Sequence, residues 1–314
     1  MIQIGIDLGG TNIVAGVVND RYEILATAKC KTNVPRPAQA IIDDMIRVAQ
    51  EAVEKAGLTM DDIDGIGIGS PGSVNPIDGI LDGASNLQIR DVHFKEIFEE
   101  RLGKPTHLEN DANAAAYGEV IAGAAKGAKH AACITIGTGV GGGVIIDGKL
   151  LYGRNYAAAE LGHLVINIDG LPCPCGRHGC LEQYASATAL VRQTKAAMEQ
   201  DKNSVMWRIS DGGTNVNGLT AFDAMREGDE TARQVVMQFA KYLAVGIINV
   251  IRFSEPEVVC VGGGVSHEGE TLLSLVREFV YEGRKNEPNE NSARIVAATL
   301  GNDAGIIGAA FAGV

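Results

Sequence analysis

A cluster of cysteines gives the chain a metal-binding pattern. Cys173, Cys175 and Cys180 fall within eight residues, in the spacing Cys-x-Cys-x4-Cys, and His163 precedes the first of them by ten positions. Three thiolates and one imidazole form a ligand set that Zn²⁺ accepts in tetrahedral geometry, and the thiolates favour zinc over magnesium. Proline and glycine residues separate the cysteines, as a chain that turns tightly around an ion requires. These four residues are therefore predicted to bind a structural zinc ion.

Two other interpretations of the cluster stay open at this point. His178 lies inside the cysteine loop and could replace His163 as a ligand, or the three cysteines could be reduced thiols in a loop. A disulfide is disfavoured in a reducing compartment. With four protein ligands the ion has no open position for water, so zinc would not be the catalyst. The other cysteines, Cys30, Cys133 and Cys260, lie in apolar segments and are predicted to be small buried residues.

Glycine-rich turns are the second pattern. The chain contains 40 glycines, and three turns that follow apolar segments, at 7–12, 137–143 and 262–264, are rich in them. Backbone N–H groups in such turns can point together at a phosphate. The three turns are therefore predicted to bind phosphate groups, with ordinary tight turns as the alternative. The candidate residues are Gly9, Gly10, Thr11, Asn12, Gly137, Thr138, Gly139, Gly262, Gly263 and Gly264.

An acidic residue at a predicted helix start is the third pattern. The alanine-rich stretch 112–128 is predicted to be helical, with Asn110 or Asp111 as its N-cap. A carboxylate in that position stays ionised, because the positive end of the helix stabilises an anion. Asp111 could therefore serve as a general base that accepts a proton from a substrate hydroxyl. From the residues alone, capping and catalysis are equally supported.

The elements that position these residues follow from hydrophobic periodicity. The first thirty residues are predicted to form strands 2–6, 13–18 and 24–30, with the first glycine turn between the first two. The same order of strand, glycine turn, strand, turn and strand returns over 131–151, which indicates two related halves. Further predictions are helices over 37–56, 231–251, 272–281 and 303–312, and strands over 63–68, 258–261 and 295–298.

Composition narrows the functional class. A formal net charge of −12 disfavours a dedicated nucleic-acid binder, which needs a basic face. We expect no membrane association, because the sequence shows no run of about 20 apolar residues and no secretory signal at its start. The expected location is the cytoplasm. A length of 314 residues is consistent with about two domains.

Several motifs together resemble the ROK sugar kinases, a family that also contains sugar-responsive repressors. The resemblance runs from Asp7 to about Gly308. It rests on Asp-Leu-Gly-Gly-Thr at 7–11, Ser-Pro-Gly at 70–72, Glu-Asn-Asp-Ala-Asn-Ala-Ala at 109–115, Gly-Thr-Gly-Val-Gly-Gly-Gly at 137–143, Glu-Leu-Gly-His at 160–163, and Cys-Pro-Cys-Gly-Arg-His-Gly-Cys-Leu-Glu at 173–182. In this order and spacing the motifs are highly specific.

The resemblance implies an α/β chain with the actin-like ATPase fold, in which two RNase H-like domains flank a cleft. We expect one domain over 1–112, to which 301–314 returns, and a second over 113–300 that carries the zinc site. The resemblance also implies that Asp111 is the general base, that Asp7 lies on the magnesium side, directly or through water, and that the protein forms a homodimer or higher homo-oligomer. The implied sugar-binding residues are Asn86, Asn110, Asp111, Glu160, His163 and Glu182.

The function expected from the resemblance is ATP-dependent phosphorylation of glucose at its 6-hydroxyl. Mg-ATP would lie between the three glycine turns. A sister kinase for N-acetylmannosamine, mannose or fructose is one alternative, because the motifs bind positions that these sugars share. A sugar sensor without catalysis is the other. Asp111 disfavours the sensor, and so does a first strand that begins at residue 2, which leaves no preceding DNA-reading helices.

Overall fold

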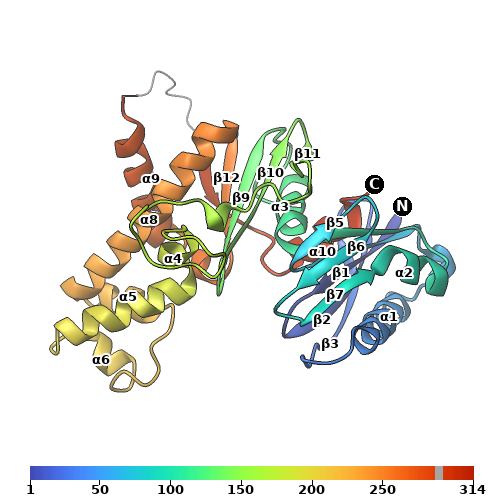
Figure 1. Cartoon of the computed structure of the whole chain (residues 1–314), viewed down its shortest axis with the longest axis horizontal. Helices are drawn as coiled ribbons and strands as arrows, with labels where there is room; N and C mark the ends of the chain where they lie inside the picture. Colours follow the sequence, from blue (N-terminus) through green and yellow to red (C-terminus); the bar gives the residue numbers. More distant parts are fainter. Residues whose placement is uncertain (287–292) are drawn as a thin grey trace. The chain divides into compact units, whose positions relative to one another are not determined.

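Two five-stranded sheets with the same strand order organise the chain (Figure 1). The first has the order β3-β2-β1-β4-β8 and the second the order β11-β10-β9-β12-β13. In each, strands that follow one another in sequence lie on one side and two later strands extend the other side. The repeated order agrees with the internal repeat predicted from the sequence.

The strands of the first sheet are β1 (Ile2–Leu8), β2 (Asn12–Asn19), β3 (Ile24–Lys31), β4 (Gly65–Ser70) and β8 (Thr106–Asn110). Those of the second are β9 (Ala131–Ile136), β10 (Val140–Ile146), β11 (Lys149–Leu150), β12 (Val258–Gly262) and β13 (Arg294–Ala297).

The computed structural model describes residues 1–286 and 293–314, and these residues group into two compact units. Unit 1 comprises Met1–Lys129, Gly143–Ala159 and Thr299–Val314. Unit 2 comprises His130–Gly142 and Glu160–Ala298. The domain division predicted from the sequence, with its boundary near residue 112, stays a prediction.

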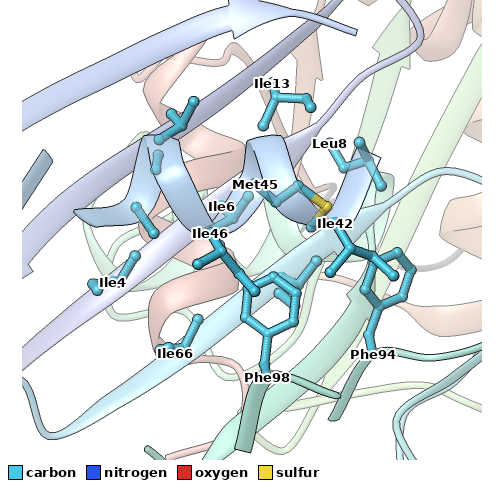
Figure 2. Close-up of a cluster of buried hydrophobic side chains, with 14 of the residues drawn as sticks. Ile4, Ile6, Leu8, Ile13, Ile42, Met45, Ile46, Ile66, Phe94 and Phe98 are labelled. Carbon is cyan, nitrogen blue, oxygen red and sulfur yellow. The ribbon is translucent and has the colours of Figure 1, made fainter. Parts of the chain in front are cut away.

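The core of unit 1 lies between one face of the first sheet and two helices. Alternate residues of a strand point to opposite faces, so Ile4, Ile6 and Leu8 share a face of β1. They pack with buried side chains of α1 (Ala38–Lys55) and α2 (Phe94–Leu102). Figure 2 shows these side chains together, with Met45 of α1 close to the isoleucines and the rings of Phe94 and Phe98 beside them.

Glycines on the opposite face of the same sheet let a helix backbone approach closely. A Cβ on Gly5 would lie 1.9 Å from the carbonyl oxygen of Ile306, and a Cβ on Gly67 would lie 1.7 Å from that of Ala309. Both carbonyls belong to α10 (Asp303–Phe311). The C-terminal helix therefore covers β1 and β4 in unit 1, and it also packs against α3 (Asp111–Ile121).

The alanine-rich helix is shorter than predicted. It ends at Ile121 rather than at residue 128. The buried carboxylate of Glu119 accepts hydrogen bonds from the backbone N–H groups of Ala124 at 2.8 Å and of Leu300 at 2.8 Å. These bonds satisfy amides of the turn that follows α3 and of the chain that returns to unit 1. Alanine content predicted a helix beyond Ile121, because alanine has a high intrinsic helix propensity. The hydrogen bonds to the Glu119 carboxylate outweigh this propensity and hold the residues after Ile121 in a turn.

Boundaries of other elements also differ from the predicted ones, and two of these differences fall at glycine-containing motifs. β4 continues through Ser70, so Gly69 and Ser70 lie within the strand rather than in a turn. β10 begins at Val140, which confines the second glycine turn to 137–139. Further elements were not predicted. In unit 1 these are α2, the strand β8 and the small sheet of β5 (Ser73–Asn75), β6 (Ile80–Ala84) and β7 (Ile89–His93). In unit 2 they are α4 (Glu182–Ala185), α5 (Ala187–Gln200), α6 (Met206–Ile209) and α7 (Thr220–Arg226).

Unit 2 contains the longest helix, α8 (Glu230–Ser254), which contacts α9 (Glu270–Arg284). By length and composition α8 could cross a membrane, and 61% of its most apolar window is buried inside the protein. Core helices of soluble proteins have the same composition. The sequence predicted this helix over 231–251 but no membrane span there, because Arg233, Lys241 and Arg252 interrupt its apolar run.

Candidate active site

Parallel strands of unit 1 bring the predicted catalytic residues to one sheet edge. β1 pairs in parallel with β4, and β4 pairs in parallel with β8. In this register Asp7 lies opposite Gly69, and Ser70 lies opposite Asn110. The carboxyl ends of parallel strands are where ligands bind in α/β proteins. Asp7, Asn110 and Asp111 therefore share an edge at which chemistry is expected.

The helix cap and the predicted base are two different residues. Asn110 is the N-cap of α3, and its Oδ1 accepts hydrogen bonds from the N–H groups of Ala112 at 3.0 Å and Asn113 at 3.2 Å. Asp111 is the first helical residue, and its Oδ1 accepts from the N–H of Ala112 at 2.9 Å. Because Asn110 supplies the cap, capping does not account for an aspartate at position 111.

Asp7 is electrostatically linked to Asp111. Burial, and to a smaller extent the negative charge of Asp111, raise the pKa of the Asp7 carboxyl from 3.8 to about 6. Two carboxylates held near each other repel, and a cation placed beside them would relieve that repulsion. The pair therefore fits a site for a divalent cation such as Mg²⁺, which prefers oxygen ligands.

Glu109 and Tyr152, which are not among the predicted site residues, form hydrogen bonds at this sheet edge. The Glu109 side chain is 1% exposed, and its Oε1 accepts hydrogen bonds from the N–H of Asn110 at 2.9 Å and Nδ2 of Asn113 at 3.0 Å. Its Oε2 accepts from the Tyr152 hydroxyl at 2.7 Å. Glu109 lies inside a motif of the family resemblance, so the sequence could have indicated it. No local signal marks Tyr152, which is 43 residues further along the chain.

The first glycine turn is fixed by its own backbone and by Thr32. The N–H of Gly9 donates to the carbonyl of Asn12 at 2.9 Å, and the Thr32 hydroxyl donates to the carbonyl of Gly9 at 2.6 Å. Asn86 lies in an exposed turn after β6, and its Nδ2 is 3.7 Å from where a Cβ on Gly10 would sit. Unit 1 thus places a predicted sugar-binding amide next to a predicted phosphate-binding turn.

In unit 2 the other two glycine turns lie against each other. They follow β9 and β12, which are parallel neighbours. Gly263 has a φ of +86°, and a Cβ there would lie 2.3 Å from the carbonyl oxygen of Ile136, so only glycine fits. A Cβ on Gly137 or on Gly264 would have no described atom within 4 Å. The two turns therefore present open backbone at one sheet edge, as a phosphate-binding site requires.

Glu182 connects the cysteine loop 173–180 with the second glycine turn. It is the first residue of α4, two positions after Cys180. Its Oε2 accepts a hydrogen bond from the N–H of Val140 at 3.0 Å and lies 2.3 Å from the position of a Cβ on Gly139. The turn is also held by the Thr188 hydroxyl, which donates to the carbonyl of Thr138 at 2.8 Å. Unit 2 thus brings a predicted sugar-binding residue and a predicted phosphate-binding turn into contact.

The predicted zinc ligands form one cluster in unit 2. One side-chain atom from each of His163, Cys173, Cys175 and Cys180 lies within 4.8 Å of the others. The Sγ atoms of Cys175 and Cys180 are 3.6 Å apart, and Nδ1 of His163 is 3.6 Å from Sγ of Cys173. A tetrahedral zinc ion with Zn–S bonds of about 2.3 Å spaces its sulfur ligands about 3.8 Å apart. The cluster therefore fits zinc, and it contains His163 and not His178.

The loop around the cluster is built to turn tightly. The N–H of Gly176 donates to the carbonyl of Cys173 at 2.9 Å, and Gly176 and Gly179 have φ values of +88° and +75°. The Arg177 N–H and guanidinium hold the pKa of the exposed Cys175 thiol down at about 6. A low thiol pKa favours the thiolate that a metal binds. The predicted sugar-binding residue Glu160 lies three residues before His163 in sequence. Glu160 is exposed, and its backbone carbonyl accepts a hydrogen bond from the N–H of His163 at 3.0 Å.

Comparison with solved structures defines the class of fold. A ROK family glucokinase from Streptomyces griseus, in complex with glucose and AMPPNP, aligns with a TM-score of 0.83 and 38% identity over 99% of this chain and 98% of its own. A ROK hexokinase from Thermus thermophilus aligns with a TM-score of 0.83 and 32% identity over 99% of this chain and 97% of its own. The α/β sheets of this chain are accordingly those of an actin-like ATPase fold, as the resemblance to the ROK sugar kinases implied.

Sequence comparison gives the family. The ROK family model matches residues 3–312. A glucokinase from Streptomyces coelicolor is 39% identical over 312 residues, which cover 98% of this chain and 96% of that protein. The chain belongs to the ROK family, as its motifs predicted.

Proposed function

We propose that the protein is an ATP-dependent glucokinase that converts glucose and ATP to glucose 6-phosphate and ADP. The observation that carries the proposal is the position of Asp111 at the carboxyl edge of a parallel sheet, where Asn110 already serves as the cap of α3. The likeness to glucokinases at 36% to 39% identity over nearly the whole chain supports glucose as the acceptor and ATP as the donor.

The proposed reaction forms a bond between the glucose 6-oxygen and the γ-phosphorus of ATP. The bond between that phosphorus and the β–γ bridging oxygen breaks, and ADP leaves. Asp111 accepts the proton of the 6-hydroxyl, in the role that a carboxylate plays in phosphoryl transfer. Mg²⁺, when bound, supplies positive charge for the phosphate oxygens, and Asp7 is the residue that we assign to its side of the site, directly or through water.

We assign the sugar hydroxyls to side chains that can accept and donate in fixed directions. The proposed sugar-binding residues are Asn86, Asn110, Asp111, Glu160, His163 and Glu182. The proposed phosphate-binding residues are Gly9, Gly10, Thr11, Asn12, Gly137, Thr138, Gly139, Gly262, Gly263 and Gly264. The contact of Glu182 with Val140 and the position of Asn86 beside Gly10 support these assignments within each unit.

We propose a structural role for zinc. Nδ1 of His163 faces the cysteines, which leaves Nε2 as the nitrogen that can donate to a sugar hydroxyl. A zinc ion on His163, Cys173, Cys175 and Cys180 would fix the tautomer and orientation of that imidazole. It would also hold Glu182, which follows Cys180 by two residues. We further propose a cytoplasmic homo-oligomer that acts on small molecules rather than on membranes or nucleic acid.

The test is coupled ADP release measured with a panel of hexoses. Glucose is expected to give the highest kcat/KM, with the product phosphorylated at the 6-hydroxyl. If kcat/KM for N-acetylmannosamine, mannose or fructose exceeded that for glucose about tenfold, the protein would be a sister hexose kinase. The loss of one hydrogen bond to the sugar can produce a factor of this size. A protein that binds sugar without releasing ADP would be a sensor.

A further inference from the structure

A buried network behind the predicted base involves Glu109, which the proposed reaction does not use. Its carboxylate lies at the end of β8, directly before the Asn110–Asp111 turn, and is almost completely buried. Burying a carboxylate is costly unless donors satisfy its oxygens. Such a cost is seldom retained for stability alone, because an apolar core residue avoids it. The contacts of Glu109 therefore indicate what it does.

One oxygen of Glu109 holds the turn that carries the base. Oε1 accepts from the backbone N–H of Asn110 at 2.9 Å and from Nδ2 of Asn113 at 3.0 Å. These donors lie on either side of Asp111 in sequence. The Glu109 carboxylate thus fixes the residue before the base and the residue two positions after it. Asn113 is itself only 6% exposed, so its side-chain amide cannot hydrogen-bond to water in place of Glu109.

The other oxygen of Glu109 depends on Tyr152. Oε2 accepts from the Tyr152 hydroxyl at 2.7 Å. Nε2 of His107 lies 3.7 Å from the same oxygen, which is too long for a hydrogen bond and forms an ion pair only when the imidazole is protonated. Burial, and secondarily the charge of Glu109, raise the pKa of the Tyr152 hydroxyl well above its usual value of 10. Tyr152 therefore keeps its proton and acts as a donor throughout the physiological pH range.

Tyr152 is itself held in place by the backbone around it. Its carbonyl accepts from the N–H of Ala158 at 3.1 Å, which closes the loop 152–158. The preceding residue, Leu151, donates its N–H to the carbonyl of Val144 in β10 at 2.8 Å. The backbone that carries Tyr152 is therefore fixed, and with it the point from which the side chain reaches Glu109.

We infer that Glu109 and Tyr152 form a positioning pair that fixes the Asn110–Asp111 turn for proton transfer. This inference rests on the proposed function of Asp111. Tyr152 orients the Glu109 carboxylate, and the carboxylate fixes the backbone and amide groups on both sides of the base. Neither residue needs to touch the substrate. Small displacements of a reacting group are costly for the chemical step, so loss of the pair should lower kcat more than it affects nucleotide binding.

The test compares Tyr152→Phe, Glu109→Gln and the double variant with the unaltered enzyme. Turnover is expressed per glucose-binding site, counted by calorimetry, so that misfolded protein does not lower the value. Tyr152→Phe is expected to lower kcat about 10-fold, since misplacing a reacting group by a fraction of an ångström has effects of this order, while KM for ATP is unchanged. The double variant is expected to lose no more than Glu109→Gln alone, as residues that act as a unit do.

The control is Tyr22→Phe, which removes a hydroxyl from another tyrosine of unit 1, whose ring packs edge-on against Phe311. Its kcat is expected to be normal. Unchanged kcat per site in Tyr152→Phe would overturn the inference, as would independent, multiplicative losses in the double variant. If Glu109→Gln does not fold, Tyr152→Phe alone decides. An unaltered protein that releases no ADP with any hexose would instead refute the proposed function.

Discussion

The carboxylate of Glu182 accepts a hydrogen bond from the backbone N–H of Val140, with 3.0 Å between Oε2 and the amide nitrogen. Val140 begins β10 directly after the glycine turn 137–139, and Glu182 begins α4 directly after the cysteine loop. Through this bond, a residue proposed for sugar binding fixes the end of a turn proposed for phosphate binding. A change in the turn should therefore be detected as a change in sugar affinity.

Gly139→Ala should weaken glucose binding. The new Cβ would lie 2.3 Å from Oε2 of Glu182, so the carboxylate would have to move and lose its bond to Val140. Loss of one such hydrogen bond predicts about a 10-fold increase in Kd for glucose, measured by calorimetry. Gly218→Ala is the control, because a Cβ there has no described atom within 4 Å. Equal glucose affinity in both variants would argue against a role for Glu182 in sugar binding.

Asp111→Asn should abolish most of the turnover while glucose binding is partly retained. Asparagine keeps the size of the side chain and its ability to accept from the N–H of Ala112, but it cannot accept the hydroxyl proton. We expect kcat to fall about 10²-fold or more. Asp20→Asn, at an exposed turn of unit 1, is the control and should keep normal kcat. Near-normal turnover in Asp111→Asn would mean that Asp111 is structural only.

Removal of zinc should affect the sugar more than the nucleotide. Elemental analysis is expected to find about one zinc per chain, the content of a single four-ligand site. Cys175→Ser should lose the metal, whereas Cys30→Ala, outside the cluster, should retain it. Stripping the ion should raise Kd for glucose more than Kd for an ATP analogue. Zinc-free protein with unaltered glucose affinity would contradict this role.

Asp7 should make stability depend on pH in magnesium-free buffer. Its pKa is 3.8 in the unfolded chain and about 6 in the fold, so between these values the folded protein binds more protons. The free energy of unfolding should therefore fall as pH rises from about 4 to about 6, by up to about 3 kcal/mol from this group. Urea titrations of Asp7→Asn should show a flatter dependence over that window. A variant with the slope of the unaltered protein would show that Asp7 is not the group responsible.

The sequence alone determined the parts of the site that are contiguous in the chain. The Cys-x-Cys-x4-Cys spacing with an upstream His163 predicted a cluster that the structure contains. Isoleucine at every second position of β1 indicated a strand, and the repeat of strand, glycine turn and strand indicated two related halves. These predictions succeeded because periodicity and short-range turn chemistry act between neighbours in sequence.

Only the tertiary structure decided which distant residues meet. Alanine content predicted a helix to residue 128, but the Glu119 carboxylate binds the amides of Ala124 and Leu300, and α3 ends at Ile121. Tyr152 carries no local signal, because its role depends on a hydrogen bond to a carboxylate 43 residues away. Sequence spacing also could not show that Asn110, rather than Asp111, caps α3. That choice depends on the backbone angles at the end of β8, which pairing with β4 imposes.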